Sequence, residues 1–402
     1  MELKASVSVD DTYRSTAELV IDGESFTVWT ESDVAVDVTG TPWLPTLRVT
    51  AMRKGLQLAI TPAVDHTALE GSLAAQDVLL DWFPEMLQRT STQAETVAPS
   101  PAEQDRRGVG CFFSGGVDSF YTALKNLDEI THLIIIHGLD ISLDNHVLWE
   151  EAVDRARTMA AELGKELIEV RSNVRLLHAK HGPHWQSQAH GAFLAHVSLL
   201  LSPHLRKVYI PASDDESRLA PLGTHPDLDP LWSSSDVEIV HDGIEADRVA
   251  KLARIKESAV AMNHLRVCWF NLASKYNCGR CEKCLRTMIG LHIVGASGQC
   301  TSLPREIPSR AVRRMYLNAA GEGGELFARE NLERLAELGE TDTELVRSLN
   351  YAVNRNKFQE FLVTARFYVI DVGFGLVRYQ ARKLFGSNRP TKTTDRPRGH
   401  AG

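Results

Sequence analysis

The residues whose types and spacing point most clearly to chemistry lie at 114–119, where the chain reads Ser-Gly-Gly-Val-Asp-Ser. They follow an apolar run at 109–113 and precede a helix-like stretch, which gives the order strand, glycine-rich turn and helix. Gly115 and Gly116 have no Cβ, so the backbone of the turn can approach an anion closely. The free N–H groups at the helix start would point at that anion. The sequence therefore predicts a turn that binds a phosphate group.

Two common phosphate-binding motifs do not fit this turn. A Walker A loop has a lysine directly after its second glycine, and no such lysine follows here. The dinucleotide fingerprint needs three glycines in the spacing G-x-G-x-x-G, which is also missing. The simplest alternative is an ordinary turn in which Ser114 or Asp118 caps a helix. The complete motif, with a strand before it and a helix after it, favours the phosphate site.

A second group of reactive side chains is independent of the first. Four cysteines follow the pattern C-x9-C-x2-C-x2-C, and they are Cys268, Cys278, Cys281 and Cys284. Four thiolates at short spacing suit a tetrahedral Zn²⁺ ion and leave no position for water. Gly279 permits a tight turn, and Lys283 and Arg286 can offset negative charge on the sulfurs. A redox pair, an iron–sulfur cluster and buried free thiols are the alternatives to zinc.

The 114–119 motif resembles the PP-loop of the ATP pyrophosphatase superfamily, whose members cleave ATP between its α- and β-phosphates. With the cysteine pattern and the basic helix that follows it, the chain is most similar to the 7-cyano-7-deazaguanine synthase family over residues 108–295. The resemblance is specific at the two motifs and loose between them. Residues 1–95 and 301–402 are extra to that family.

The resemblance implies a role for each residue of the turn. The residues that would hold the pyrophosphate of ATP are Ser114, Gly115, Gly116, Val117 and Ser119. Asp118 would order the loop or its Mg²⁺ ion, and Asp118 and Ser119 are the catalytic candidates. The superfamily holds adenine and ribose after the next strand, which makes His137 and Asp140 further candidates for ATP binding.

Composition limits the class of protein. The chain has 402 residues, 43% of them hydrophobic, and a formal net charge of −8, which argues against a large basic face for nucleic acid. A small-molecule or protein acceptor is therefore the expected partner. The N-terminus lacks the apolar core of a signal peptide, no apolar run is long enough to span a membrane, and we expect a cytoplasmic protein. Cys111 and Cys300 do not imply a disulfide framework.

The pattern along the chain predicts several units. The first, at 1–90, is a small β-rich unit with strand-like runs at 25–29, 34–38 and 47–50, ending in a helix. A polar, proline-bearing linker at 91–107 follows, then an α/β domain with the zinc knuckle at 108–300, a helical region at 301–386 and a disordered tail at 387–402. The helices of the 301–386 region are candidates for contact with a partner protein or a second copy of the chain.

Alternating strand-like and helix-like runs in the central domain predict an open parallel sheet covered on both faces. Ligands of such sheets bind at the carboxyl ends of the strands. Segments 137–140, 171–173 and 212–216 should therefore lie near the 114–119 loop, and Asp215 in the last of them is a candidate for acceptor binding.

A long irregular stretch at 222–235 is a second candidate for acceptor binding. Its polar and aromatic residues include His225, Asp227, Asp229 and Trp232, although a surface excursion fits the pattern equally well. Four histidines at 178–190 fit no standard metal spacing, so we do not expect a second metal there. The segment 361–379 carries a lone Gly-x-Gly; we expect it to pack on the domain rather than touch a membrane or a partner.

Together these features predict an ATP-dependent ligase that forms a C–N bond, with ATP, Mg²⁺ and Zn²⁺ as its cofactors. A carboxylate or amide oxygen of the acceptor would attack the α-phosphate, pyrophosphate would leave, and a nitrogen nucleophile would displace AMP. Catalysis would then rest on positioning and electrostatics. The alternatives are a sulfur-transfer enzyme and a non-catalytic ATP-binding interaction protein. An asparagine-synthetase-type enzyme is disfavoured because no cysteine precedes Cys111.

Overall fold

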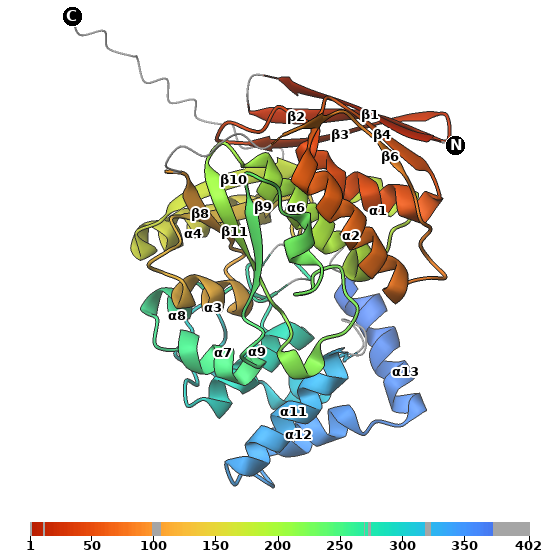
Figure 1. The fold of residues 1–402 in the computed structure, drawn as a ribbon. Coiled ribbons are helices and arrows are strands. Elements are labelled where there is room, and N and C mark those ends of the chain that lie inside the picture. The colour runs from red at the N-terminus through yellow and green to blue at the C-terminus, as the bar shows by residue number, and fades with distance from the viewer. Residues whose placement is uncertain are drawn as a thin grey trace, which may run out of the picture.

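The structure is a computed structural model, and it describes residues 2–10, 13–98, 106–268, 270–271, 275–317 and 323–372. Its main feature is one ten-stranded, mostly parallel sheet in the order β12-β11-β8-β9-β10-β3-β2-β1-β4-β6 (Figure 1). The strands are β1 (Glu2–Asp10), β2 (Arg14–Ile21), β3 (Glu24–Ser32), β4 (Gln57–Thr61), β6 (Thr92–Gln93), β8 (Gly108–Phe112), β9 (His132–His137), β10 (Glu166–Ser172), β11 (Leu205–Pro211) and β12 (Glu238–Asp242). A two-stranded sheet pairs β5 (Val64–Asp65) with β7 (Thr96–Val97).

Helices cover both faces of the parallel half of the sheet, as the sequence predicts. Alternate side chains of each strand divide between two cores: Ile134 and Ile136 of β9 join one core, while Leu133 and Ile135 join the other. The first core includes α1 (Leu44–Lys54), α2 (His66–Trp82), α5 (Val174–His181) and α6 (His190–Leu200). The second includes α3 (Val117–Lys125), α4 (His146–Leu163), α7 (Arg248–Ile255), α8 (Ala259–His264) and α9 (Glu282–Ile293).

The N-terminal strands continue the central sheet instead of forming a sheet of their own. β3 pairs antiparallel with β10, with Val170 opposite Ser32 and Ser172 opposite Thr30. The first part of the expected linker also belongs to this layer, because β6 pairs with β4 and β7 pairs with β5. Residues 99–105 of that linker lie outside the described residues.

Two of the predicted N-terminal strands are wrong. Residues 47–50 lie inside α1, and residues 34–38 form no regular element. Although 47–50 contains two β-branched residues, a proline opens the helix and Gly55 closes it in the left-handed conformation at φ +65°. Residues 44–52 of α1 are buried between the sheet and other helices, and this tertiary burial overrides the local β propensity.

Beyond α9 the described chain is helical, as predicted. The helices are α10 (Ser309–Arg313), α11 (Gly323–Glu337), α12 (Glu344–Val353) and α13 (Lys357–Arg366), and a π-helical turn, η6, spans Phe367–Val372. In Figure 1 α11–α13, drawn in blue, lie at the end of the molecule opposite the red strands β1–β4. Residues 373–402, including the predicted tail and the Gly-x-Gly, lie outside the described residues.

His196 of α6 joins three elements inside the first core. Its Nδ1 donates a hydrogen bond to the carbonyl of Pro42 at 2.8 Å, and its Nε2 lies 2.8 Å from Oγ1 of Thr30 in β3. Pro42 belongs to η1 (Thr41–Trp43), which precedes α1. The ring is fully buried, and this burial lowers the pKa of His196 to about 4.

This burial predicts a loss of stability in weak acid. Unfolded chains take up a proton on histidine at a pKa of 6.5, whereas the folded state resists protonation down to about pH 4. The free energy of unfolding should therefore fall as the pH drops from about 7 to about 5, and it should fall less in His196→Gln. Urea denaturation at both pH values measures the difference. An unchanged pH dependence in His196→Gln, equal to that of the exposed control His66→Gln, would contradict the assignment.

Candidate functional site

The 114–119 loop joins β8 to α3 at the carboxyl edge of the sheet. Gly115 has a φ of +73°, and Gly116 precedes the first residue of α3, Val117. The carbonyl of Gly115 accepts a hydrogen bond of 2.7 Å from the backbone N–H of Arg266. A Cβ on Gly115 would lie 3.3 Å from Cε of Met159, so the loop packs closely against the side chain of Met159. The first N–H groups of α3 have no partners within the helix and can bind an anion.

Of the other residues in the 114–119 loop, the two serines line a pocket and Val117 is part of the second core. Ser114 is exposed and lines the pocket described below, and its Oγ accepts a hydrogen bond of 3.4 Å from the N–H of Gly116. The hydroxyl of Ser119 donates to the carbonyl of Gly116 at 3.0 Å and also lines the pocket. Val117 is buried in the second core, so only its backbone is available to a ligand.

A pocket of about 240 Å³ lies beside the loop. The strand ends of β8, β9 and β11 form its floor, and α4 and α6 contribute side chains to its walls. One part is apolar, with Ile134, Ile136, Ile141 and Trp149 among the lining residues. The other part is polar and includes Ser114, Asp118, Arg266 and Lys283. The pocket therefore combines an apolar wall with a cationic end at the helix start of α3.

Two cations reach this pocket from segments around the cysteine motif. Arg266 follows α8, and its Nη2 donates a hydrogen bond of 2.8 Å to Oδ1 of Asn271, whose Nδ2 donates to the carbonyl of Asp140 at 2.7 Å. Lys283 lies in the first turn of α9, where burial lowers its pKa and repulsion from Arg286 lowers it further. Buried positive charge of this kind is offset when an anion binds.

Asp118 faces cations on α7. Its Oδ1 lies 3.3 Å from Nη1 of Arg248 and 3.5 Å from Nζ of Lys251. Lys251 is almost fully buried and donates to the carbonyl of Ala212 at 2.7 Å, and burial lowers its pKa. Burial raises the pKa of the neighbouring Asp214, and the negative charge of Asp118 raises it further. These contacts tie the 114–119 loop to α7 and to the segment after β11.

The C-terminal helices support these cations from outside the sheet. Phe327 of α11 packs against three guanidinium groups, with Arg286 at 3.9 Å and Arg218 at 5.3 Å from its ring centroid, and Arg248 at 5.9 Å. Glu330 of the same helix pairs with Arg218 at 2.8 Å. Helix α11 therefore holds Arg248, the partner of Asp118, and two further arginines that do not line the pocket.

His137 is the last residue of β9 and Asp140 lies three residues later, but their side chains are placed differently. Asp140 is exposed and lines the pocket. His137 is buried: its Nε2 donates to the carbonyl of Ser142 at 3.1 Å, and its ring stacks on Trp149 at 4.4 Å. Burial lowers the pKa of His137 to about 4, so the ring is neutral near pH 7. His137 orders the loop over the pocket and does not line it.

The structure does not bring the acceptor candidates to this pocket. Trp232 is 1% exposed in the first core, His225 packs on Trp82 of α2 with its ring centroid 4.8 Å away, and Asp227 is exposed beside it. Asp229 is fully buried and accepts a hydrogen bond of 2.7 Å from Nδ1 of His241. The 222–235 segment thus packs α2 against the edge of the sheet. The number of polar residues in the segment does not predict this structural role.

Asp215 lies closer to the site, but it is already engaged within the protein. Its carboxylate caps the short helix η3 (Glu216–Arg218) by accepting a hydrogen bond of 3.0 Å from the N–H of Ser217. It also pairs with Arg218 at 3.5 Å. Asp215 is absent from the lining of the pocket, whereas Ser213, two residues earlier, is part of it.

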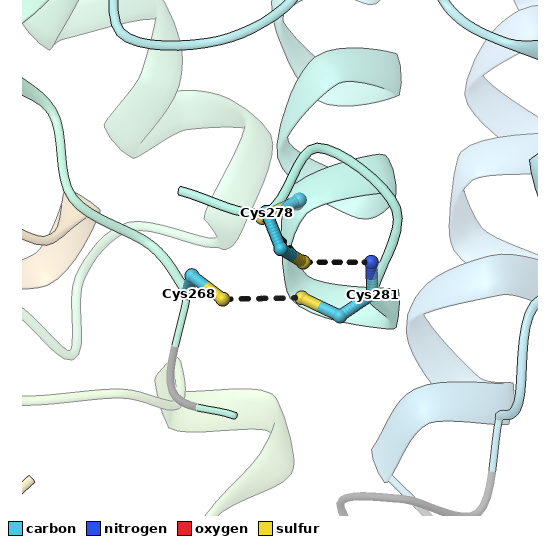
Figure 2. Close-up of side chains that lie close together, drawn as sticks. Cys268, Cys278 and Cys281 are labelled. Atoms are coloured by element: carbon cyan, nitrogen blue, oxygen red, sulfur yellow. Dashed lines mark hydrogen bonds between the residues drawn. The ribbon is translucent and has the colours of Figure 1, made fainter. Parts of the chain in front are cut away.

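The four cysteines of the second motif converge on one point, as predicted. Figure 2 shows Cys268 facing Cys281, with Cys278 beside them. The Sγ atoms of Cys268 and Cys281 are 3.8 Å apart, as are those of Cys278 and Cys284, and all four lie within 4.8 Å of one another. A tetrahedral ion with metal–sulfur bonds of about 2.3 Å separates its sulfurs by about 3.8 Å. The cluster therefore has the dimensions to hold a metal ion such as zinc.

Residues next to the cysteines fix this arrangement. Asn277 accepts hydrogen bonds from the N–H groups of Val267 (2.9 Å) and Cys268 (3.2 Å), and its Nδ2 donates to the carbonyl of Leu265 at 2.8 Å. Gly279 has a φ of +70°, which permits the tight turn between the second and third cysteines. The N–H of Cys281 donates to Sγ of Cys278 at 3.2 Å, a contact that favours a thiolate.

No second metal cluster is present among the residues that the structure describes. Cys300 is buried next to Ser302, and Cys111 lies inside the sheet, where burial raises its pKa. Of the histidines at 178–190, His178 and His181 are buried on α5. One of that group, His190, lines the pocket instead.

Sequence reasoning missed the pocket side of the cysteine motif. From the sequence, we expect Lys283 to offset the negative charge of the cysteine sulfurs. In the structure, Lys283 lines the pocket beside the 114–119 loop. Two cysteines of the cluster, Cys281 and Cys284, flank Lys283 at the start of α9 and fix its direction. Arg266 and Trp149 carried no signal, because their proximity to the loop arises only from the tertiary fold.

Comparison with known proteins finds no matching family model, no matching characterised protein and no matching solved structure. Among the described residues, none of the helices combines the length and the apolar composition that crossing a bilayer requires. The function of the site therefore has to be argued from its own geometry.

The cysteine cluster makes a direct prediction. Cys284→Ser should lose the bound metal and lower the melting temperature by roughly 5 °C or more, because the ligands hold three segments together. Cys300→Ser is the matched control, since it removes a buried thiol outside the cluster and should keep the metal. Metal analysis and thermal denaturation of both variants measure the effect. Full metal content in Cys284→Ser, or equal loss in Cys300→Ser, would contradict the assignment.

Proposed function

We propose that the protein is an ATP-dependent ligase-like enzyme of the PP-loop ATP pyrophosphatase type, and that its cysteine cluster holds a structural zinc ion. It would adenylate a carboxylate or amide of an acceptor, release pyrophosphate and allow a nitrogen nucleophile to displace AMP. The observation that carries this proposal is the pocket beside the 114–119 loop. A glycine turn at a helix start, two cations and an apolar wall border the same space there.

The two parts of the pocket suit the two parts of a nucleotide. The apolar wall near Ile134, Ile136 and Trp149 fits a purine ring. The loop amides with Arg266 and Lys283 fit phosphate oxygens, because charge-assisted hydrogen bonds to phosphate are strong. ATP is therefore a better match than a neutral ligand of the same size.

The proposed reaction balances without a covalent enzyme intermediate. An acceptor oxygen forms a bond to the α-phosphorus, and the bond from that phosphorus to the bridging oxygen breaks, so the electron pair leaves with pyrophosphate. An amine nitrogen then attacks the activated carbon, AMP leaves, and the nitrogen loses a proton to solvent. The loop amides, Arg266 and Lys283 stabilise the departing pyrophosphate, and bound Mg²⁺ would supply further positive charge.

The contacts of Asp118 favour one of its two predicted roles. Its carboxylate is engaged by Arg248 and Lys251, which supports ordering of the loop rather than direct coordination of Mg²⁺. We therefore propose Asp118 as a positioning residue. Ser119, whose hydroxyl is bonded to the carbonyl of Gly116, would act through its backbone N–H at the helix start.

The contacts of the cysteines argue against the alternative of a sulfur-transfer enzyme. Such an enzyme needs a reactive thiol at the nucleotide site, and the four clustered cysteines are engaged with one another. Cys111 and Cys300 are buried and do not line the pocket, and burial raises the pKa of both thiols. Zinc with four sulfur ligands has no open position for water, so its proposed role is structural.

The proposal predicts acceptor-dependent release of pyrophosphate. Purified protein with ATP, Mg²⁺, ammonium and a panel of carboxylates that includes 7-carboxy-7-deazaguanine should form AMP and pyrophosphate with one acceptor class. Lys283→Met should lower that rate by about 10- to 100-fold, because it removes a charged contact to phosphate. Asp118→Asn should also lower the rate of pyrophosphate release, because the 114–119 loop would lose the carboxylate that positions it.

The control is Lys180→Met, which removes an exposed lysine of α5 that pairs with Glu24 far from the pocket, and it should leave the rate unchanged. Mass spectrometry of the acceptor identifies the product. Tight ATP binding without pyrophosphate release for any acceptor would overturn the ligase and favour a non-catalytic ATP-binding protein. Equal rates in Lys283→Met and Lys180→Met would remove the pocket from the reaction.

A further inference from the structure

Helix α13 and the π-helical turn after it expose an apolar stripe. Its exposed side chains are Phe358 (69% exposed), Phe361 (65%), Leu362 (51%), Tyr368 (58%) and Val369 (68%). Their spacing places them along one side of a helix. Of the segment 361–379, which we expect to pack on the domain, residues 373–379 lie outside the described residues, and four side chains between 361 and 369 belong to this exposed stripe. Phe367 is buried against Tyr316 and Phe270, and Tyr368 also contacts Tyr316, with ring centroids 6.1 Å apart.

A basic groove adjoins this stripe. It lies between α10 and α13, has a volume of about 300 Å³, and is lined by Arg310, Arg314 and Arg366 together with the cysteine-motif residue Arg280. A second hollow of about 490 Å³ shares these first three arginines and adds Arg313 and the stripe residue Leu362. Stripe and groove are thus one continuous surface.

The groove has more arginines than carboxylates: Glu282 also lines it, and that carboxylate pairs with Arg286 at 3.3 Å. Within the described part of the chain, Arg310, Arg313, Arg314 and Arg366 form no ion pair, and Arg313 stacks on the ring of Tyr351 at 3.8 Å. The acidic residue of α13, Glu360, pairs with Arg355 at 2.9 Å. A surface with exposed rings, aliphatic side chains and uncompensated arginines calls for an occupant that is both apolar and anionic.

Charge argues against two possible occupants of the groove that this protein could itself supply. A second copy would bring the same arginines against this groove, which like-charge repulsion opposes. The C-terminal segment 373–402 contains seven Lys and Arg residues and one acidic residue, Asp395, so it is also repelled by the groove. These basic residues instead add to the attraction for an external anion.

Single-stranded nucleic acid fits less well. Such ligands stack their bases on free aromatic faces in a basic groove. In this groove Tyr316 and Phe367 stack on each other with centroids 4.6 Å apart, which occupies those faces. The exposed rings of the stripe, Phe358, Phe361 and Tyr368, line neither of the two hollows that hold the arginines. A helical stripe of aromatic and aliphatic side chains flanked by arginines is typical of a helix that lies on a membrane.

We propose that α13 and the turn after it bind the surface of an anionic phospholipid bilayer. Phe358, Phe361 and Leu362 insert among the acyl chains near the interface, and Arg310, Arg314 and Arg366 bind lipid phosphates. The helix lies on the bilayer and does not cross it, in keeping with its ten residues. The pocket beside the 114–119 loop takes no part in this contact.

Vesicle flotation of the full chain tests the proposal. The protein should float with vesicles of phosphatidylcholine mixed with phosphatidylglycerol and remain in solution with phosphatidylcholine alone. The double variant Phe358→Ser, Phe361→Ser should reduce the partition coefficient by about tenfold or more, because two rings no longer insert. Arg310→Gln, Arg314→Gln should reduce it as well, and added salt should weaken binding of the wild type.

Val147→Ser is the matched control, because Val147 of α4 is 59% exposed and lies outside the stripe. It should float as the wild type does. Unchanged thermal melting of all variants excludes unfolding as the cause of lost binding. Failure of the wild type to float, or flotation that the phenylalanine variants do not change, would overturn the proposal. Binding of a labelled single-stranded oligonucleotide through the same arginines, without flotation, would assign the groove to nucleic acid instead.

Discussion

The structure of the site depends on the convergence of four sulfur atoms within 4.8 Å of one another. This constraint joins the irregular segment after α8, the turn at Gly279 and the first turn of α9. Because Cys281 and Cys284 fix the start of α9, one of the two residues between them, Lys283, is directed into the pocket beside the 114–119 loop. Cys281 also lines the basic groove on the other side. One cluster therefore positions residues of two separate surfaces.

The extra regions of the chain are part of the same framework. Pairing of β3 with β10 extends the parallel half of the sheet into the N-terminal layer, and His196 ties α6 to that layer. At the other end, Phe327 and Glu330 of α11 hold the arginines that surround Asp118. The N-terminal strands and α11 thus support the elements around the pocket without lining it.

Features encoded in short stretches could be predicted from the sequence. The 114–119 loop, the four cysteines, and runs such as β9 and α4 owe their structure to neighbouring residues, so local pattern was sufficient. Features that depend on distant contacts were missed. Residues 47–50 look like a strand, but burial in α1 makes them helical, and Trp232 looks like a ligand contact, but it fills the core. The exposed stripe on α13 has the same periodicity as a packed helix, and only the absence of a covering element among the described residues distinguishes the two.

The central claim is that the cysteine cluster and the 114–119 loop form one nucleotide site. Calorimetric titration with α,β-methylene ATP, which cannot be cleaved between its first two phosphates, tests it most directly. The account predicts that metal-free Cys284→Ser, measured at a temperature where it is still folded, binds the analogue about tenfold or more weakly than metal-loaded Cys300→Ser, because Lys283 is no longer held in the pocket. Equal affinity in the two variants would contradict the account, since the cluster would then have no part in nucleotide binding.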